Sequence, residues 1–315
     1  MFRLQVLESV DSTNEVIKRA IEDGEPEGLA IRAYRQTGGY GRQGRAWKSP
    51  RGGMYESILL RPEVEMRELP TLALVAAIAV RRALASLVVD DQARRICIKW
   101  PNDVVLVGGD FGADYSTRDT ALELSGHTPC SDSPALENSP LGCSHRAELR
   151  AAHARQAQGL QASQTNAPSI KSLYSKLAGI SSEVHAGGIC VGIGVNVEPP
   201  EDAMEVGGKN APAYLADLGF GFTCEREAAI NAVGDAVLHE FEPLYRRWCD
   251  GGFAALSGEF AEHSMLEGRF VRMANQLGEV VCEGTVRGVD ASGRLILRLE
   301  DGEAKAVASG EVHLL

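Results

Sequence analysis

The spacing of hydrophobic and polar residues predicts a strand and then a helix at the start of the chain. Residues 4–7 alternate between apolar and polar positions, which is typical of a half-buried strand. Apolar residues within 16–21 then recur on one helical face. Ser12 and Glu15 have the spacing of a capping box, and Gly24 is a suitable stop. We therefore expect a helix between these signals.

Further apolar runs predict an alternation of strands and helices. Residues 71–89 are helical in pattern and almost wholly apolar early on, so they predict a core helix. Apolar residues between 230 and 248 follow 3-and-4 spacing and predict a long amphipathic helix, which Pro243 should kink or break. Strands are predicted at 29–34, 54–60, 96–100, 104–107, 178–184 and 189–197.

After about His263 the pattern changes to short strands separated by turn residues. The predicted strands are 269–273, 280–289, 295–299 and 304–308. This predicts a small barrel-like β-domain over 263–315, which follows a larger domain over 1–262.

Residues 109–172 interrupt the larger domain. Within 109–169 there is no Val, Ile, Met or Trp, and six leucines cannot build much of a core. Such a composition rarely offsets the entropy lost on ordering. We expect a disordered or loosely docked insertion.

Composition and charge exclude several classes of protein. The 315 residues include 43 acidic and 32 basic side chains, and the net charge of −11 argues against a general nucleic-acid binder. The richest apolar run, 69–89, contains Arg81 and Arg82, so no membrane span or secretory leader is expected. Seven cysteines without a C-x-x-C pair predict reduced thiols in a cytoplasmic protein.

A loop at residues 36–47 combines four glycines with a high density of cations. Glycines let a backbone approach a ligand closely, and guanidinium groups match phosphate oxygens. The loop therefore suits a polyanion such as a nucleotide triphosphate, although a solvated basic loop is the plain alternative. Gly39-x-Gly41-x-x-Gly44 formally fits the dinucleotide fingerprint, but 47–53 cannot form the helix that this motif requires. The five cations in and around the loop are Arg35, Arg42, Arg45, Lys48 and Arg51.

Three further segments carry candidate chemistry. Lys99-Trp100-Pro101-Asn102-Asp103 offers a lysine, an amide and a carboxylate at one strand end, suited to phosphate, ligand and Mg²⁺, although an ordinary turn has the same pattern. Lys176 enters a strand beside Ala178 and Gly179, where an edge-strand lysine is the alternative. Glycines in 192–197 leave room for a ligand, and Asn196 offers an amide.

The order of these segments is more specific than any one of them. Ser12-Thr13-Asn14, the glycine loop, KWPND, KLAG and GIGVNV occur in turn, and Ser309-Gly310-Glu311-Val312 follows in the small β-domain. This order resembles the biotin protein ligases (biotin–acetyl-CoA-carboxylase ligases) over 1–107 and 175–315. Because the chain begins directly with the catalytic segments, it resembles the monofunctional class without an N-terminal DNA-binding domain.

The resemblance implies an α/β fold: a mixed sheet like that of class II synthetases with flanking helices, followed by an SH3-like barrel. It also implies two reactions with ATP and biotin as substrates and Mg²⁺ as cofactor. Biotin and ATP form biotinyl-5′-AMP, and a lysine of a biotin carboxyl carrier protein then accepts biotin. No nucleic-acid or membrane partner is expected, and a homodimer through an exposed sheet edge stays open.

The resemblance also implies roles for individual residues. Lys176 is the expected catalytic cation at the biotin carboxylate and the α-phosphate, with Arg42 and Lys99 beside it. Asp103 is the expected metal ligand. The implied biotin-binding residues are Ser12, Thr13, Asn14, Gln36, Tyr40, Gly41, Arg42, Trp47 and Lys176. The implied ATP-binding residues are Arg42, Arg45, Lys99, Asn102, Asp103 and Asn196.

The chain departs from the family pattern in two places. The family loop usually reads G-R-G-R-x-G-R, and Tyr40 stands at its first arginine, so one cation is lost. The family has a short turn between KWPND and KLAG, whereas 72 residues separate Asp103 from Lys176 here. Loop-closure entropy grows only slowly with length, so the sheet can tolerate the insertion. Two alternatives stay open: a lipoate-type acyl-protein ligase and a non-catalytic biotin-binding protein.

Overall fold

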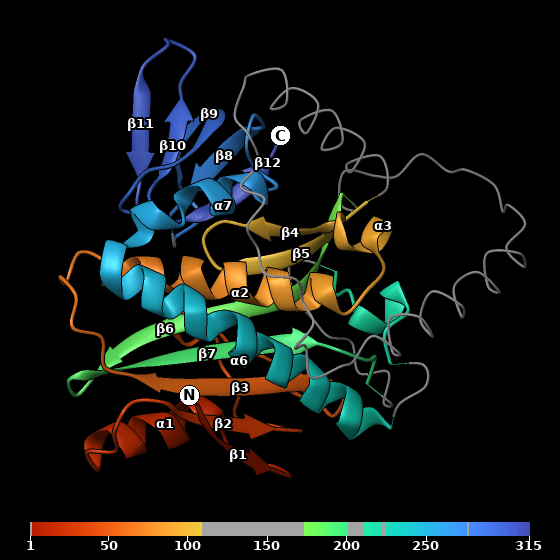
Figure 1. Cartoon of the computed structure of the whole chain (residues 1–315). Helices are drawn as coiled ribbons and strands as arrows, with labels where there is room; N and C mark the ends of the chain where they lie inside the picture. Colours follow the sequence, from red (N-terminus) through yellow and green to blue (C-terminus); the bar gives the residue numbers. More distant parts are fainter. Residues whose placement is uncertain (1, 109–172, 201–210, 222–224, 276) are drawn as a thin grey trace, which may run out of the picture.

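The computed structural model describes residues 2–108, 173–200, 211–221, 225–275 and 277–315. The predicted insertion at 109–172 lies outside these residues, so its disorder stays a prediction. Two sheets and the helices around them form the described part of the chain (Figure 1). This confirms the predicted α/β class.

The larger sheet has seven strands in the order β1-β2-β3-β7-β6-β5-β4. Its first pair, β1 and β2, is parallel, and the remaining pairs are antiparallel. The sheet is therefore mixed, as predicted. Its strands are β1 (Arg3–Leu7), β2 (Leu29–Ala33), β3 (Gly53–Leu60), β4 (Ile96–Lys99), β5 (Asp103–Val107), β6 (Tyr174–His185) and β7 (Gly188–Asn196).

The smaller sheet is antiparallel, with the order β11-β10-β9-β8-β12. Its last strand was not predicted from the apolar pattern. The smaller sheet lies over the β4–β5 end of the larger sheet (Figure 1). There Trp100 Nε1 donates a hydrogen bond to the Gly293 carbonyl at 2.9 Å. The strands are β8 (Phe270–Ala274), β9 (Val280–Val289), β10 (Leu295–Arg298), β11 (Ala304–Val307) and β12 (Glu311–Leu314).

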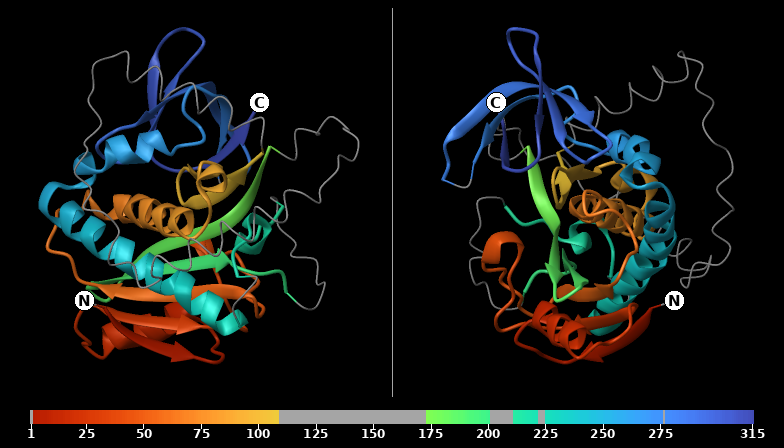
Figure 2. Two further views of the ribbon diagram at one scale, coloured as in Figure 1. Left: turned by 45° about the vertical axis from the view of Figure 1, so that its right-hand side comes forward. Right: turned by 90° about the vertical axis from the view of Figure 1, so that its left-hand side faces the viewer.

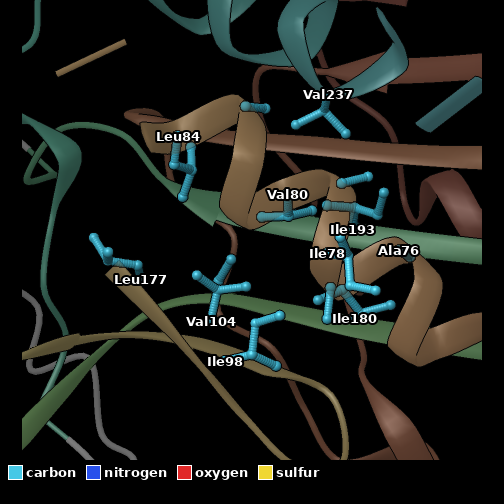
Figure 3. Packing of buried hydrophobic residues seen from close by; sticks show 14 of the residues in the cluster. Ala76, Ile78, Val80, Leu84, Ile98, Val104, Leu177, Ile180, Ile193 and Val237 are labelled. Carbon is cyan, nitrogen blue, oxygen red and sulfur yellow. The ribbon is translucent and has the colours of Figure 1, made fainter. Parts of the chain in front are cut away.

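Helices cover both faces of the larger sheet (Figures 1 and 2). The described α-helices are α1 (Thr13–Glu22), α2 (Leu72–Ser86), α3 (Asp90–Ala93), α6 (Arg226–Gly251) and α7 (Ser257–Glu262). Helices α2 and α6 lie on one face, and α1 lies on the other. Figure 3 shows α2 packed on strand residues such as Ile180 and Ile193, with Val237 of α6 above it. Ile17 and Ile21 of α1 pack on Leu59 from the opposite side.

Helix α2 shows why a long apolar run is not by itself a membrane span. Within the described residues, 69–86 is the one helical stretch long and apolar enough to cross a membrane by length and composition. However, 61% of that window is buried inside the protein, between the sheet and α6. The run is therefore apolar because α2 is a core helix, as predicted.

Three local predictions need correction. Of the kink or break predicted at Pro243, the break is wrong, because helix α6 continues through this residue. The helix predicted over 71–89 is shorter than expected, since α2 ends at Ser86 and the separate short α3 begins only at Asp90. Ser12 is the N-cap of α1, but its side chain makes no capping bond, and Glu15 binds Lys18 and Tyr40 instead of closing a capping box.

A β-bulge in β6 determines where Lys176 points. The pairing of β5 with β6 shifts between Val104 and Val105, so Leu177 has no partner of its own in β5. Leu177 packs in the core together with Ile180 (Figure 3), although an odd and an even position of a regular strand would face opposite ways. The bulge thus places Lys176 on the same face as Gly179, and their proximity agrees: a Cβ on Gly179 would lie 3.1 Å from Lys176 Nζ.

The chain leaves and re-enters the larger sheet at one point. Val107 pairs with Tyr174, and the Gly108 amide donates to the Leu173 carbonyl at 3.1 Å. Beyond the bulge, β5 and β6 therefore stay paired up to the last described residues on each side. Lys176 keeps its place beside Asp103 despite the intervening 64 residues at 109–172.

Candidate functional site

A cavity of about 710 Å³ lies on the face of the larger sheet that does not carry α2 and α6, and it extends to the smaller sheet. Its walls come from α1, the glycine loop at 36–47, the β4–β5 turn, strands β6 and β7, and residues 310–313. In the right-hand view of Figure 2 the loop, in red-orange, projects from the sheet on the side opposite α6. Segments far apart in the sequence thus converge on one hollow.

One end of the cavity is lined by the uncharged polar side chains of Thr13, Asn14 and Ser181. Ser57 bonds to the first two, and we call these four residues the floor. Ser57 Oγ lies 2.6 Å from Asn14 Oδ1 and 2.7 Å from Thr13 Oγ1. Asn14 Nδ2 donates to Ser181 Oγ at 3.4 Å, and the Thr13 amide donates to Gln36 Oε1 at 2.8 Å. All four floor residues are buried. The floor is a preorganised set of donors and acceptors without a net charge.

Gly192 keeps the floor open. A Cβ at this position would lie 2.3 Å from Asn14 Oδ1 and 2.7 Å from Ser181 Oγ, closer than any real contact. A larger residue would therefore displace the Asn14 and Ser181 side chains. The glycine in GIGVNV makes room for the polar side chains of Asn14 and Ser181, and the room for a ligand expected at this segment stays a prediction.

The glycine loop is a short hairpin over the cavity. The Trp47 amide donates to the Gly39 carbonyl at 2.9 Å, and the Gly41 amide donates to the Arg45 carbonyl at 2.8 Å. A single 3₁₀ turn, Arg42–Gly44, forms its tip. The loop therefore does not open a helix of the dinucleotide-binding kind, which confirms the reason for rejecting that motif.

The opposite end of the cavity is cationic. Lys176 Nζ lies 2.7 Å from Asp103 Oδ1, and its side chain is 21% exposed. Arg42 Nη1 donates to Asn102 Oδ1 at 3.1 Å, and Arg45 Nη2 pairs with Glu311 Oε1 of β12 at 2.5 Å. Each of these three cations thus has a carboxylate or amide oxygen as partner.

Backbone contacts hold Lys176 in place from both sides. Its amide donates to the Ala211 carbonyl and its carbonyl accepts from the Ala213 amide, both at 2.9 Å. Asn196 Nδ2 of β7 also donates to the Lys176 carbonyl at 3.0 Å. The predicted nucleotide-binding Asn196 therefore orients the strand that carries Lys176.

Lys99 is the most deeply buried cation of the cavity, with 8% of the residue exposed. Burial lowers its pKa, and the nearby Lys176 lowers it further, whereas Asp103 and Glu311 act to raise it. Its ammonium lies 5.5 Å from the centre of the Tyr174 ring. Burial likewise lowers the pKa of Arg42, although a guanidinium stays charged at neutral pH.

Trp47 covers the strand glycines between the two ends. Its ring is 4.8 Å from Lys176 Nζ, and a Cβ on Gly194 would lie 3.0 Å from its Nε1 atom. The indole therefore packs tightly on Gly179 and Gly194, where a Cβ would force the ring to shift by a few tenths of an ångström. Its Nε1–H is buried and has no acceptor among the described residues.

The structure brings the predicted site residues together, with one exception. Thirteen of the fourteen line the cavity, while Ser12 is buried behind it. The five predicted cations around the loop do not all converge, because Arg51 pairs with Glu8 and Glu227 away from the cavity and Arg35 does not line it.

Sequence reasoning missed several residues that line the cavity or support its floor. Ser181 follows the KLAGI segment directly and Ser57 lies within an apolar strand, so each reads as an ordinary strand residue. Glu311 was recognised only as part of the SGEV segment, and its contact with Arg45 depends on how the two sheets pack. Tyr174 lies near the undescribed residues, and no motif in the sequence marked it as a cavity residue.

Comparisons with known proteins identify related families for two parts of the chain. Residues 6–112 match the biotin/lipoate A/B protein ligase family, and residues 268–315 match the biotin protein ligase C-terminal domain. These two ranges contain the floor's Thr13 and Asn14, the whole glycine loop, KWPND and Glu311.

Individual relatives match over different lengths. A biotin–[acetyl-CoA-carboxylase] ligase of Mycobacterium tuberculosis is 24% identical over 99% of this chain and 89% of its own length. The corresponding ligase of Paracoccus denitrificans is 39% identical over 39% of this chain and 48% of its own length. The bifunctional ligase/repressor BirA of Bacillus spizizenii is 36% identical over 31% of this chain, and the match spans only 30% of that relative.

Solved structures share the fold over the full chain. The biotin protein ligase of Aquifex aeolicus in complex with biotin and ATP has a TM-score of 0.64 and 23% identity, covering 100% of this chain and 99% of that one. The Leishmania major enzyme in complex with biotinyl-5-AMP has a TM-score of 0.50 and 17% identity, covering 98% and 99%. At these identities the likeness establishes the fold alone.

Proposed function

Since the chain belongs to the biotin protein ligase family, we propose that it attaches biotin to protein in two ATP-dependent steps. The observation that carries this proposal is the arrangement of the cavity. An uncharged hydrogen-bonding floor lies at one end and a cluster of cations lies at the other. Such a cavity suits a ligand with a neutral polar ring and a carboxylate tail, with a nucleotide beside the carboxylate.

In the first step, a carboxylate oxygen of biotin attacks the α-phosphorus of ATP. The bond from this phosphorus to the bridging oxygen breaks, and pyrophosphate leaves. Lys176 and Arg42 are the expected stabilisers of the charge that develops on the phosphoryl oxygens, because both line the same end of the cavity. Holding the two anions together supplies much of the remaining rate enhancement.

In the second step, the amine of an acceptor lysine attacks the acyl carbon of biotinyl-5′-AMP. The acyl–oxygen bond breaks, AMP leaves, and the nitrogen loses a proton. The glycine loop covers the cavity, which supports a role in keeping water from the reactive anhydride. We propose that the acceptor is a biotin carboxyl carrier domain.

Magnesium fits the carboxylate chemistry of the cationic end. Mg²⁺ is often held by one or two carboxylates together with substrate phosphates, so a cage of protein ligands is not required. Among the described residues no group of three or more His, Cys, Asp or Glu side chains is arranged for a metal. Asp103 is the proposed ligand, and the ion would neutralise phosphate charge when the nucleotide is bound.

We further propose a cytoplasmic location, where ATP is available and thiols stay reduced. The four cysteines that the structure describes are free thiols: Cys97, Cys190, Cys249 and Cys282. Free thiols are typical of a reducing compartment.

The floor favours biotin over a lipoyl substrate. A ureido ring presents two N–H donors and a carbonyl acceptor, which match the amide and hydroxyl groups of Asn14 and Ser181. An apolar dithiolane ring would leave without a partner the donors and acceptors that the floor residues do not use among themselves, which costs about 1–3 kcal/mol for each unsatisfied group. We therefore expect discrimination against lipoate of at least about tenfold.

The deciding experiment measures labelled-acid transfer to a carrier domain by the full chain. With biotin and ATP we expect pyrophosphate release and a mass increase of one biotinyl group on the acceptor lysine. Replacing ATP by its α,β-methylene analogue should abolish both signals, because the bond that breaks in the first step is then absent.

Two outcomes would contradict the proposal. Transfer of lipoate in preference to biotin would assign the chain to the lipoate-type alternative. Tight biotin binding without ATP-dependent pyrophosphate release would mean a binding protein without turnover.

A further inference from the structure

Tyr40, which stands where the family loop has an arginine, joins three charged side chains outside the cavity. Its hydroxyl donates to Glu15 Oε1 at 2.5 Å and accepts from Lys18 Nζ at 2.7 Å. The same ammonium lies 2.7 Å from Glu183 Oε2. We call this group of four residues, Glu15, Lys18, Tyr40 and Glu183, the clamp.

The clamp continues the two elements that form the floor. Lys18 lies four residues after Asn14 in α1, hence on the same helical face one turn further along. Glu183 lies two residues after Ser181 in β6, hence on the same face of that strand. Tyr40 therefore fastens the glycine loop to the floor elements from outside, since its three partners do not line the cavity.

The clamp does not have the chemistry of an anion site. Two carboxylates face one ammonium, so the clamp carries net negative charge. Burial and the hydrogen bond to Glu15 raise the pKa of Tyr40 to about 12, so the phenol stays protonated and neutral at physiological pH. Burial alone would lower the pKa of Lys18, but hydrogen bonds to Glu183 and Tyr40 raise it, so the ammonium stays charged.

The loop tip is attached in a different way. Arg42 binds the Asn102 side chain and Arg45 binds the Glu311 carboxylate, and both arginines line the cavity. A phosphate in the cavity would compete for these two guanidinium groups. No such competition reaches Tyr40, because its partners lie outside.

We propose that Tyr40 is a positioning residue that pins the base of the glycine loop in the empty and the loaded enzyme alike, so that ligand exchange moves the tip at 41–45. Its use in ligation rests on the proposed function, but the pinning itself does not. A pinned base lowers the ordering cost that a ligand must overcome, and hence raises affinity for the acid.

The first test needs no substrate. In the ligand-free full chain, Tyr40→Phe removes the hydroxyl and keeps the ring. We expect amide hydrogen exchange at residues 37–47 to accelerate about tenfold, while exchange in β7 is unchanged. The matched control is Tyr245→Phe. Tyr245 lies on α6, away from the loop, and its hydroxyl donates to Glu27 Oε2 at 3.0 Å.

Substitutions of Lys18 test the same clamp through the ammonium that binds Tyr40 and Glu183. Lys18→Met should accelerate loop exchange to a similar extent, whereas Lys18→Arg should keep it within about threefold of the wild type, because a guanidinium can bridge both carboxylates. Unchanged loop exchange in Tyr40→Phe would overturn the proposal. Equal acceleration in the loop and in β7 would overturn it as well, because the loss would then be global.

The second test uses turnover. Tyr40→Phe should raise KM for biotin about tenfold and lower kcat by a smaller factor. A loop that must be ordered on binding lowers the affinity for biotin more than it slows the chemical step. A larger fall in kcat than rise in KM would place Tyr40 at the reacting atoms and overturn the proposal. If no ligation occurs in any variant but the exchange results hold, the proposed function fails and the pinning stands.

Discussion

The two ends of the cavity differ in how their polar groups are satisfied before a ligand binds. At the floor, neutral amide and hydroxyl groups bond to one another, as Asn14 does with Ser57 and Ser181. At the cationic end, Lys176 and Arg45 each lie against a carboxylate. A ring can therefore bind at the floor by exchanging weak neutral hydrogen bonds, whereas a phosphate at the cationic end has to replace a charged partner.

The largest effect is expected when a cation is removed from the cationic end. Lys176→Ala removes the ammonium that lies beside Asp103, and adenylate formation should fall at least about 100-fold, the magnitude typical of losing one donor to transition-state charge. Pyrophosphate release measures this step. Lys305→Ala, which removes an ammonium from β11 outside the cavity, is the control. An unchanged rate in Lys176→Ala would remove this lysine from the mechanism.

A smaller effect is expected at the floor. Ser181→Val replaces the hydroxyl by a methyl group, adds a second methyl group, and leaves the Asn14 amide without this partner. KM for biotin should rise about tenfold, or about 1.4 kcal/mol, with a smaller change in kcat, because the floor contacts the ring and not the reacting atoms.

The neighbouring serine provides the control for this substitution. Ser182 points to the opposite face of β6 and does not line the cavity, so Ser182→Val should leave KM for biotin within twofold. If Ser181→Val lowers kcat and leaves KM unchanged, the floor is not a ring-binding site.

The smallest expected effect is a difference between the two ends of the cavity in their response to pH. Burial lowers the pKa of Lys99 below its ordinary value of 10.5. A lysine binds phosphate only when protonated, so the contribution of Lys99 is present at low pH and is lost as pH rises through this lowered pKa. KM for ATP should therefore rise several-fold between pH 7 and pH 10, while KM for biotin, set at the uncharged floor, should change less.

Lys99→Arg isolates this residue, because a guanidinium stays charged throughout that range. We expect KM for ATP to have a flatter pH profile in the variant than in the wild type. The same steep profile in both proteins would mean that another group, and not Lys99, titrates.

The sequence predicts the fold and most of the cationic end because its motifs combine residue types in an order that few other families share. KWPND and the glycine loop lie in short turns, where the type of residue alone indicates a role. Lys176 was identified by its motif, but its direction depends on the bulge at Leu177. A one-residue register shift of this kind leaves no trace in the pattern of apolar positions, because both Leu177 and Ala178 are apolar.

Ser57 and Ser181 of the floor and the contacts of the clamp could not be predicted, since they depend on the packing of distant elements. Ser181 becomes a floor residue only because β6 lies across from α1, 167 residues away along the chain. Tyr40 was read as the loss of a cation, and its hydrogen bonds to Glu15 and Lys18 follow from the packing of the loop on α1. Arg51 shows the opposite error, since its ion pairs with Glu8 and Glu227 hold it outside the cavity.

The pairing of Val107 with Tyr174 has a practical consequence for engineering. Because Gly108 and Leu173 are hydrogen-bonded neighbours, new chain ends or a fused reporter placed there would leave the strands on each side in their present alignment. Opening the polypeptide at this junction, and joining the original ends by a linker, would yield a circular permutant that retains every cavity-lining side chain. The sheet thus offers a ready position for a sensor domain whose signal reports on the neighbouring cavity.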